Sequence, residues 1–303
     1  MDRLGAMEAF VAVVEAGSFS AAALRLHSSK SLVSRLVAAL EGELGARLFH
    51  RTTRSLTLTE EGRGYHAQVV RILSDITDAN LSVTTLQAAP RGLLRINAPM
   101  SFGYLHLAPA IPDFLTLYPE VEIDLTMSDR IVDLVDEGVD LAVRLGRLSD
   151  SSLVARKLAP VRRAVCASPA YLKAHGTPQT PDDLIHHQCL CYSNLSMSQE
   201  WRFMRADGTA WPVEVHGRLR ADNGDALREA ALKDLGLVYL PSFIIGRDLQ
   251  AATLVSVLTD YVAQDSNVYA VYPHARHLSP KVRAFVDFMA SRFGARPYWD
   301  LVE

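Results

Sequence analysis

The segment SKSLVSRLVAALEGELG, residues 29–45, has the pattern of an amphipathic helix. At about 100° per residue its apolar side chains fall on one side and its short polar side chains on the other. These sets are Leu32, Val33, Leu36, Val37, Leu40 and Leu44 on the apolar side and Ser31, Ser34, Arg35 and Ala38 on the polar side. A helix can approach base edges in the major groove of DNA only if the side chains on its outer face are short. Arginine on such a face can bind guanine through two hydrogen bonds. The segment therefore predicts a groove-reading helix that ends at Gly45.

Two shorter helices are expected upstream of this segment. Apolar residues recur at helical spacing up to Val14, and Gly17 follows at the place of a left-handed C-terminal cap. Ser18 or Ser20 can then cap a second helix of small residues that ends near His27. Joined to the third helix by a short turn, this pair predicts a helix-turn-helix.

A hairpin is expected downstream, where residues 48–51 and 55–59 alternate apolar and polar side chains around a polar turn. We expect side chains of the third helix at base edges, and Lys30 and this wing at the DNA backbone or minor groove. The predicted DNA-contacting residues are Ser29, Lys30, Ser31, Ser34, Arg35, Arg51, Thr53 and Arg54. The alternative is a three-helix bundle whose third helix is merely solvated. The basic wing tip beside a groove-compatible helix favours DNA binding.

A longer helical pattern begins at Thr59, an N-cap residue type followed by two glutamates, continues to Ala88 and stops at Pro90. Its apolar residues alternate spacings of four and three, a repeat of about 3.5 residues that is typical of a coiled-coil seam. The seam residues are Tyr65, Val69, Ile72, Ile76, Ala79, Val83 and Leu86. Two interpretations stay open, because such a helix either pairs with a second copy or lies on the core of its own chain.

The C-terminal two thirds alternate predicted strands and helices, which is typical of an α/β domain with a mostly parallel sheet. Strands are expected at 93–98, 121–127 and 139–145, with helices at 104–118 and 131–137. A second α/β stretch begins near residue 163, and the strand at 268–272 and the helix at 279–293 are expected to return to the first. We therefore divide the chain into 1–59, a linker helix at 60–90, and 91–303, with lobe I at 91–162 and 268–303 and lobe II at 163–267.

Ligands of open α/β sheets bind beyond the carboxyl ends of strands, next to helix N-termini whose free N–H groups favour anions. Residues at these places are candidates for a small-molecule site between the lobes. The candidates are Met100, Ser101, Phe102, Ser128, Asp129, Arg144, Ser193, Asn223 and Ser242. Ser101 also suits the N-cap of the next helix, and Arg144 also suits a structural ion pair. The helix ends favour a small carboxylate or aromatic acid as ligand.

The composition narrows the class of protein. A chain of 303 residues suggests about two domains, and 49% hydrophobic with 21% charged residues is typical of soluble globular proteins. No apolar run approaches the roughly 18 residues of a membrane span. Acids at Asp2 and Glu8 do not suit a secretory signal, so we expect a cytoplasmic protein. The net charge of -3 argues against a chain that coats nucleic acid non-specifically.

Three cysteines, Cys166, Cys189 and Cys191, are too few and of the wrong number for a disulfide framework, so we expect reduced thiols. Cys189, Cys191 and His187 would share one face of a strand, but their spacing is not that of a zinc site, and buried thiols are the favoured interpretation. We predict no metal, no cofactor and no catalytic set. An enzyme with a cysteine nucleophile is an alternative that requires a paired histidine in a cleft.

Several runs share one family pattern. They are 10–23 (FVAVVEAGSFSAAA), 33–35 (VSR), 40–45 (LEGELG), 48–54 (LFHRTTR), 58–62 (LTEEG), 140–146 (DLAVRLG), 167–172 (ASPAYL) and 272–276 (YPHAR). In these runs the chain resembles the LysR family of transcriptional regulators across nearly its whole length. Ser28 and residues 30–32 depart from the family's usual residues in the turn and at the start of the third helix. Residues 233–234 and 252–253 also depart, at places where the family tends to have glycine.

The resemblance implies an α plus α/β fold: a winged helix-turn-helix, a long linker helix and a two-lobed, periplasmic-binding-protein-like effector-binding domain at 91–303. It implies a transcriptional regulator that binds double-stranded operator DNA as a dimer, through the linker helix, or as a tetramer. A small-molecule effector would bind in the interlobe cleft, and RNA polymerase is a candidate further partner. The alternative is a protein that only sequesters or delivers a ligand, which leaves residues 1–59 without a use.

Overall fold

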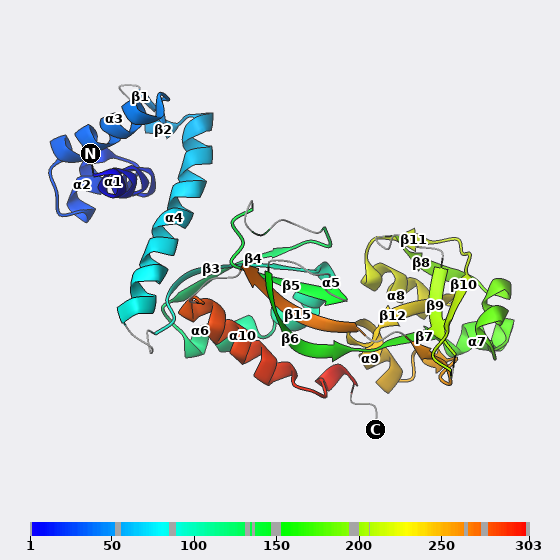
Figure 1. Ribbon diagram of the computed structural model, residues 1–303. Helices are drawn as coiled ribbons and strands as arrows, with labels where there is room; N and C mark the ends of the chain where they lie inside the picture. The colour runs from blue at the N-terminus through cyan, green and yellow to red at the C-terminus, as the bar shows by residue number, and fades with distance from the viewer. Residues whose placement is uncertain are drawn as a thin grey trace. The chain divides into compact units, whose positions relative to one another are not determined.

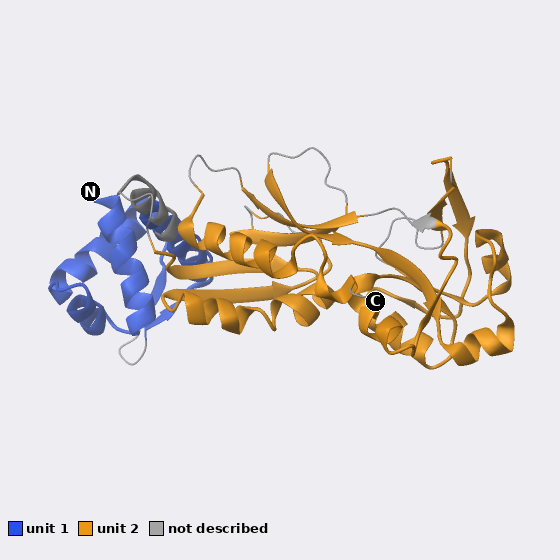
Figure 2. Ribbon diagram, turned by 90° about the horizontal axis from the view of Figure 1, so that it is seen from below, with its two compact units in different colours: residues 1–88 blue, residues 89–303 orange. Residues whose placement is uncertain are grey.

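The computed structural model describes residues 2–51, 56–84, 89–130, 134, 137–146, 153–193, 200–205, 207–263, 266–273 and 278–300. The chain forms two compact units, residues 1–88 and 89–303 (Figure 2). Each unit has its own core of buried apolar side chains.

The first unit is a helix-turn-helix with a small wing and a long following helix (Figure 1). Its elements are α1 (Arg3–Ala16), α2 (Phe19–Arg25), α3 (Lys30–Leu44), β1 (Phe49–Arg51), β2 (Leu56–Leu58) and α4 (Glu60–Thr84). Phe10 of α1 is fully buried, and its ring lies 5.4 Å from that of Phe49 and 5.6 Å from that of Tyr65. One aromatic cluster therefore joins α1, the wing and α4.

The helix ends follow from local sequence. Gly17 and Gly45 close α1 and α3 in the left-handed conformation, with φ of 68° and 66°, where a side chain would be strained. The N-cap of α2 is Ser18 rather than Ser20, since its hydroxyl accepts the Ala21 N–H at 3.1 Å. Ser29 caps α3 by accepting the Leu32 N–H at 3.2 Å. The expected positions of these three helices are confirmed.

Buried polar side chains fix the base of the wing. The Glu41 carboxylate, only 7% exposed, accepts the N–H groups of Leu48 at 2.8 Å and Phe49 at 3.2 Å. Thr59 accepts the Gly62 N–H at 2.8 Å and donates its hydroxyl to the Arg47 carbonyl at 2.7 Å. These bonds tie the end of α3 and the start of α4 to the hairpin.

The first turns of α4 pack on their own chain. Val69 is fully buried, Tyr65 packs against the helix-turn-helix core, and α4 contacts α1. Ile72, one turn further along the predicted seam, is 40% exposed. The first seam residues, Tyr65 and Val69, are therefore packed within their own unit, whereas the seam is exposed at Ile72. Ala79, Val83 and Leu86 lie outside the side chains that the structure describes.

Lobe I of the second unit is built on a five-stranded sheet in the order β4-β3-β5-β15-β6. The strands are β3 (Gly92–Ala98), β4 (Val121–Met127), β5 (Leu141–Gly146), β6 (Leu153–Val161) and β15 (Ser266–Pro273). The pairs of β3 with β4 and with β5 are parallel, whereas β15 runs antiparallel to both of its neighbours. As expected, the chain returns to this lobe through β15 and α10 (Pro280–Phe293).

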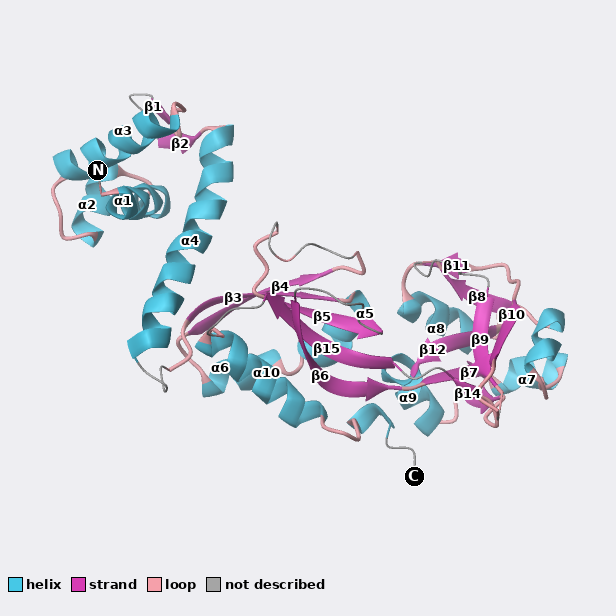
Figure 3. Ribbon diagram, in the orientation of Figure 1, coloured by secondary structure: helices cyan, strands magenta, loops and turns pink. Residues whose placement is uncertain are grey.

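Lobe II holds a second five-stranded sheet, in the order β11-β8-β12-β7-β13, and a small three-stranded sheet, β10-β9-β14 (Figure 3). The strands of the larger sheet are β7 (Arg163–Ala167), β8 (Cys189–Tyr192), β11 (Arg220–Ala221), β12 (Leu237–Pro241) and β13 (Val255–Val257). Those of the smaller sheet are β9 (Glu200–Met204), β10 (Ala210–Glu214) and β14 (Val262–Ala263). The helices of this lobe are α7 (Pro169–His175), η2 (Pro181–His186), α8 (Gly224–Leu232) and α9 (Ser242–Gln250), and η3 (Tyr298–Asp300) follows α10 near the C-terminus. Two mixed α/β sheets therefore confirm the two-lobed class, although the sheets are less parallel than expected.

The single helix predicted at 104–118 is three shorter pieces. These are α5 (Met100–Phe102), the π-helical η1 (Gly103–Leu107) and α6 (Ile111–Leu117). Pro112 is at the start of α6, where a proline begins a helix well but cannot continue one from upstream. The helix predicted at 131–137 lies largely outside the described residues.

Two departures from the family pattern are left-handed turns without glycine. Asp234 and Ala252 adopt φ of 61° and 54°, at the ends of α8 and α9. Such residues carry a steric cost that glycine avoids.

None of the described helices is by itself long and apolar enough to cross a membrane. Only α1 and α2 taken together, with a 117° bend between them, meet that requirement of length and composition.

Candidate DNA interface and effector cleft

Helix α3 presents the two faces that its sequence predicts. Val33, Val37 and Leu40 are fully buried, whereas Lys30, Ser31, Arg35 and Ala38 are exposed and Ser34 is half-buried. Ser29 is exposed but its hydroxyl already caps the helix and lies 3.0 Å from that of Ser31. The exposed face is therefore short, polar and basic, as groove reading requires.

The basic residues of the first unit differ in their partners. Arg3 pairs with Glu43 at 3.3 Å and Arg25 pairs with Glu15 at 2.6 Å. Among the residues that the structure describes, neither Lys30 nor Arg35 forms an ion pair. Both positive charges on the α3 face are thus available to a polyanion.

The predicted wing residues lie largely outside the described part of the structure. Arg51 ends β1, and its side chain is outside the described part of the structure, as are Thr53 and Arg54 altogether. Their contact with the DNA backbone stays a prediction.

A pocket of about 220 Å³ opens between lobes I and II. From lobe I it is lined by Ser101, Ser128, Asp129 and Arg144, all four of them predicted. The lining is completed by Pro99 and Leu145 of lobe I and by Arg163, Tyr192, Gly224, Tyr239, Leu240, Pro241, Phe243 and Ile244 of lobe II.

The other predicted effector residues are not among those that line this pocket. Met100 donates its backbone N–H to Asp129 at 3.1 Å, and Phe102 is fully buried in the core. Asn223 caps α8 and also donates to the Ser101 hydroxyl across the lobes at 3.5 Å. Ser193 is exposed next to β8. Ser242 lines a different pocket.

The cleft combines two arginines with one carboxylate. Arg144 donates to the Asn97 side chain at 3.0 Å, and burial lowers its pKa. Arg163 has no ion-pair partner among the described residues, and burial lowers its pKa as well. Burial and the nearby charges of Asp222 and Asp225 raise the pKa of Asp129. An unpaired guanidinium in a half-closed pocket favours an anionic ligand.

Three helix N-termini face the same pocket. Gly224 begins α8, Phe243 and Ile244 are in the first turn of α9, and Ser101 is in the first turn of α5. Asp129 and Asn223 already accept first-turn N–H groups of α5 and α8, whereas α9 has no side-chain cap, so its first turn adds partial positive charge and donors for an anion. The cleft can therefore bind a small carboxylate.

The cysteines do not form a reactive site. All three are free and buried, and burial raises the pKa of the Cys166 and Cys189 thiols to about 12. Cys191 points back to the Cys189 carbonyl at 3.3 Å, and burial raises its pKa too. The described residues include no cluster of metal-binding side chains.

Two family models match the chain. The bacterial regulatory helix-turn-helix protein model of the lysR family matches residues 4–63, and the LysR substrate binding domain model matches residues 87–294. The chain belongs to the LysR family. It is accordingly a DNA-binding transcriptional regulator with an effector-binding domain, and the family is not one of enzymes.

The similarity extends over whole proteins. An uncharacterized HTH-type transcriptional regulator of Haemophilus influenzae is 39% identical, covering 93% of this chain and 98% of the relative. The structure of CrgA, a LysR-type transcriptional regulator from Neisseria meningitidis, is 35% identical with a TM-score of 0.62, over 95% of this chain and 97% of CrgA. The full-length virulence activator AphB of Vibrio cholerae is 30% identical with a TM-score of 0.60, over 95% and 98%.

In this LysR-type regulator, Arg163 and Tyr239 line the cleft but were not predicted from the sequence. The predicted candidates follow the carboxyl ends of strands, whereas Arg163 begins β7. Because β7 runs antiparallel to β12, Arg163 lies opposite Pro241 at the carboxyl end of β12. The only sequence signal was a charged residue at the start of an otherwise apolar strand.

Proposed function

We propose that this LysR-type regulator binds operator DNA as a dimer or a tetramer, and that a small carboxylate or aromatic acid in the interlobe cleft changes that binding. The observation that carries the proposal is the exposed face of α3. There Lys30 and Arg35 have no acidic partner among the described residues, while Arg3 and Arg25 elsewhere in the same unit do. Ser31, Ser34 and Arg35 would read bases, and Lys30, Arg51, Thr53 and Arg54 would hold the DNA backbone.

Dimerisation through the linker helix is supported by exposure along its predicted seam. Ile72 is 40% exposed on α4, one turn beyond the buried Val69. An apolar seam in solvent favours association with a second copy. Two heads held by one pair of helices would read two half-sites of a symmetric operator in the cytoplasm. The proposed division is a DNA-binding domain at 1–59, a linker at 60–90 and an effector-binding domain at 91–303.

The preference for an acid in the cleft rests on its charges and helix ends. Arg163 and Arg144 line the cleft together with the N-termini of α5, α8 and α9. Effector and operator binding must be coupled in both directions, because each would favour one arrangement of the same protein.

Fluorescence anisotropy of the full chain with its own upstream intergenic DNA tests the proposal, in a salt series and with competitor DNA. Competitor-resistant binding to a site with two-fold symmetry is the expected result. Binding that stays weak and vanishes with salt on every upstream fragment would contradict it. A panel of small carboxylates and aromatic acids, added to the bound complex, then tests the cleft, with Ser128→Ala as the variant that should weaken the response.

A further inference from the structure

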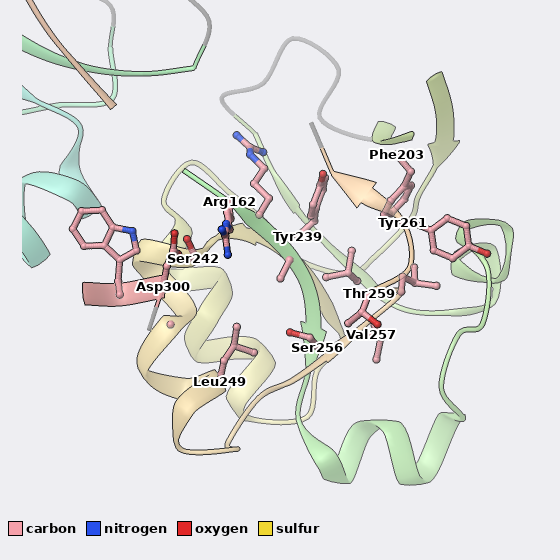
Figure 4. A pocket seen from close by; sticks show the side chains of 16 residues that line it. Arg162, Phe203, Tyr239, Ser242, Leu249, Ser256, Val257, Thr259, Tyr261 and Asp300 are labelled. Atoms are coloured by element: carbon pink, nitrogen blue, oxygen red, sulfur yellow. The ribbon is translucent and has the colours of Figure 1, made fainter. Parts of the chain in front are cut away.

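A second, larger pocket lies between lobe II and the C-terminal η3, separate from the cleft. Its volume is about 430 Å³, against about 220 Å³ for the cleft pocket. It lies between β7, β13 and α9, and the C-terminal η3 closes one side of it (Figure 4). A pocket of this size suits a small metabolite.

One end of this pocket holds polar atoms that lack partners. Ser242 Oγ and Asp300 Oδ1 are buried and form no hydrogen bond within the part of the chain that the structure describes. Ser242 is 8% exposed. Arg162 also lines this pocket, and Figure 4 shows it labelled on the same side as Ser242 and Asp300. Buried polar groups are nearly always paired in folded proteins, so two unpaired ones in a single pocket indicate a missing partner.

The other end is apolar and aromatic. Figure 4 shows Phe203, Val257 and Tyr261 on the side of the pocket away from Asp300. Phe203 and Val257 belong to the buried core of lobe II. The pocket therefore suits a molecule with an apolar body and a compact polar head.

The polar end contains both signs of charge. A guanidinium and a hydroxyl can bind a carboxylate, and the Asp300 carboxylate needs a donor. We propose that this pocket is a second small-molecule site that binds an α-amino acid with an apolar side chain. Its carboxylate binds Arg162 and Ser242, its ammonium binds Asp300, and its side chain lies against Phe203 and Tyr261.

The second site shares a wall with the cleft. Arg163 and Tyr239 line both pockets, and the Arg163 guanidinium lies 5.8 Å from the centre of the Tyr239 ring. A ligand that shifts this pair on one side changes the other pocket. Any such coupling is reciprocal, so an effector in the cleft would change amino acid binding by the same factor.

Calorimetric titration of the full-length protein tests the site with three probes: L-phenylalanine, 3-phenylpropanoate, which lacks the ammonium, and 2-phenylethylamine, which lacks the carboxylate. L-Phenylalanine is expected to bind at least about tenfold more tightly than either of the others, because each loses a charge-assisted hydrogen bond. Asp300→Asn should weaken L-phenylalanine about tenfold and leave 3-phenylpropanoate unchanged. Ser242→Ala should weaken both acids, whereas the cleft variant Ser128→Ala should weaken neither.

Circular dichroism and operator binding of the same preparations show that each variant is folded, so a negative result bears on the second site and not on DNA binding. The proposal is overturned if L-phenylalanine shows no saturable binding at millimolar concentration. It is equally overturned if Asp300→Asn weakens all three probes alike, or if Ser128→Ala removes binding that Asp300→Asn and Ser242→Ala leave intact.

Discussion

Single residues of the first unit separate DNA recognition from structure. Arg25 is held by Glu15 at 2.6 Å, whereas Arg35, on the next helix, has no ion pair among the described residues. Lys30 is equally unpaired but is at the start of α3, nearer to where a DNA backbone passes a recognition helix. Removal of one positive charge is therefore expected to affect DNA binding differently at Arg25, Lys30 and Arg35.

Arg35→Ala should relax sequence preference, at a cost of about 1–3 kcal/mol on the preferred operator, because a bidentate base contact is lost. Lys30→Ala should weaken all sequences alike and reduce the salt slope by about one, because a phosphate contact is lost. Arg25→Ala is the matched control and should change neither. Anisotropy on specific and random DNA across a salt series measures both quantities, and equal effects of Arg35→Ala on the two DNAs would contradict the assignment.

Two glutamates on α3, Glu41 and Glu43, are predicted to contribute differently to the stability of the head. Glu41→Ala leaves the Leu48 and Phe49 N–H groups without a buried acceptor, and should destabilise the wing base by roughly 2–3 kcal/mol. Glu43→Ala removes only an exposed pair with Arg3 and should cost less than about 1 kcal/mol. Hydrogen exchange at the amides of Leu48 and Phe49 is the direct readout. Protection there that survives Glu41→Ala would disprove the role of this carboxylate.

At the scale of elements, the apolar stripe of α4 is longer than the part of it that packs within its own unit. Tyr65 packs against the core of the head and Val69 is fully buried, while Ile72 on the same seam is 40% exposed. A helix whose apolar stripe continues beyond its intramolecular contacts requires a further partner to bury it. The periodicity of the sequence could not show where the stripe stops packing on the head and becomes available to a second copy.

Ile72→Asp should therefore shift the protein toward the monomer and leave the head folded, because a charge in the seam opposes pairing of the helices. Val69→Ala should do the reverse: it should destabilise the head by roughly 1–3 kcal/mol and leave the oligomeric state unchanged. Light scattering gives the mass and thermal unfolding gives the stability. A wild-type protein that is already monomeric would disprove the dimer seam.

At the scale of the second unit, His106 connects three distant parts of the chain. Its Nε2–H donates to the Phe243 carbonyl of lobe II at 2.9 Å, and its Nδ1 accepts from the Tyr298 hydroxyl at 2.6 Å. Its ring lies 4.4 Å from that of Trp299. Only the neutral imidazole can donate and accept in this way.

Burial lowers the pKa of His106 from 6.5 to about 4, so between these values the unfolded chain binds a proton that the folded chain does not. The contribution of His106 to stability is complete above about pH 6.5 and is lost as the pH falls to about 4, an effect of up to about 3 kcal/mol. His106→Gln should flatten that part of the stability profile, and His216→Gln, on an exposed residue, should not. Urea unfolding across this pH range measures the slope, and identical slopes for all three proteins would exclude the effect.

The sequence by itself determined the local structure of the head and the class of the whole chain. The left-handed Gly17 and Gly45, the caps at Ser18 and Ser29 and the two faces of α3 each depend on residues within a turn or two of one another. Ser101, Ser128, Asp129 and Arg144 of the cleft could be predicted because three short segments of lobe I end at the same sheet edge.

Asn223, which donates to Ser101 across the lobes, was predicted, but only the tertiary structure decided which other lobe II residues face the cleft. Arg163 reaches the cleft because β7 runs antiparallel to β12, and His106 meets Phe243 because α9 lies against the π-helical segment that interrupts the predicted helix. Ser242 was predicted for the cleft but lines the pocket behind it, beside Asp300. Periodicity shows which side of an element is buried, but strand direction and the neighbour that covers that side depend on contacts between residues far apart in the sequence.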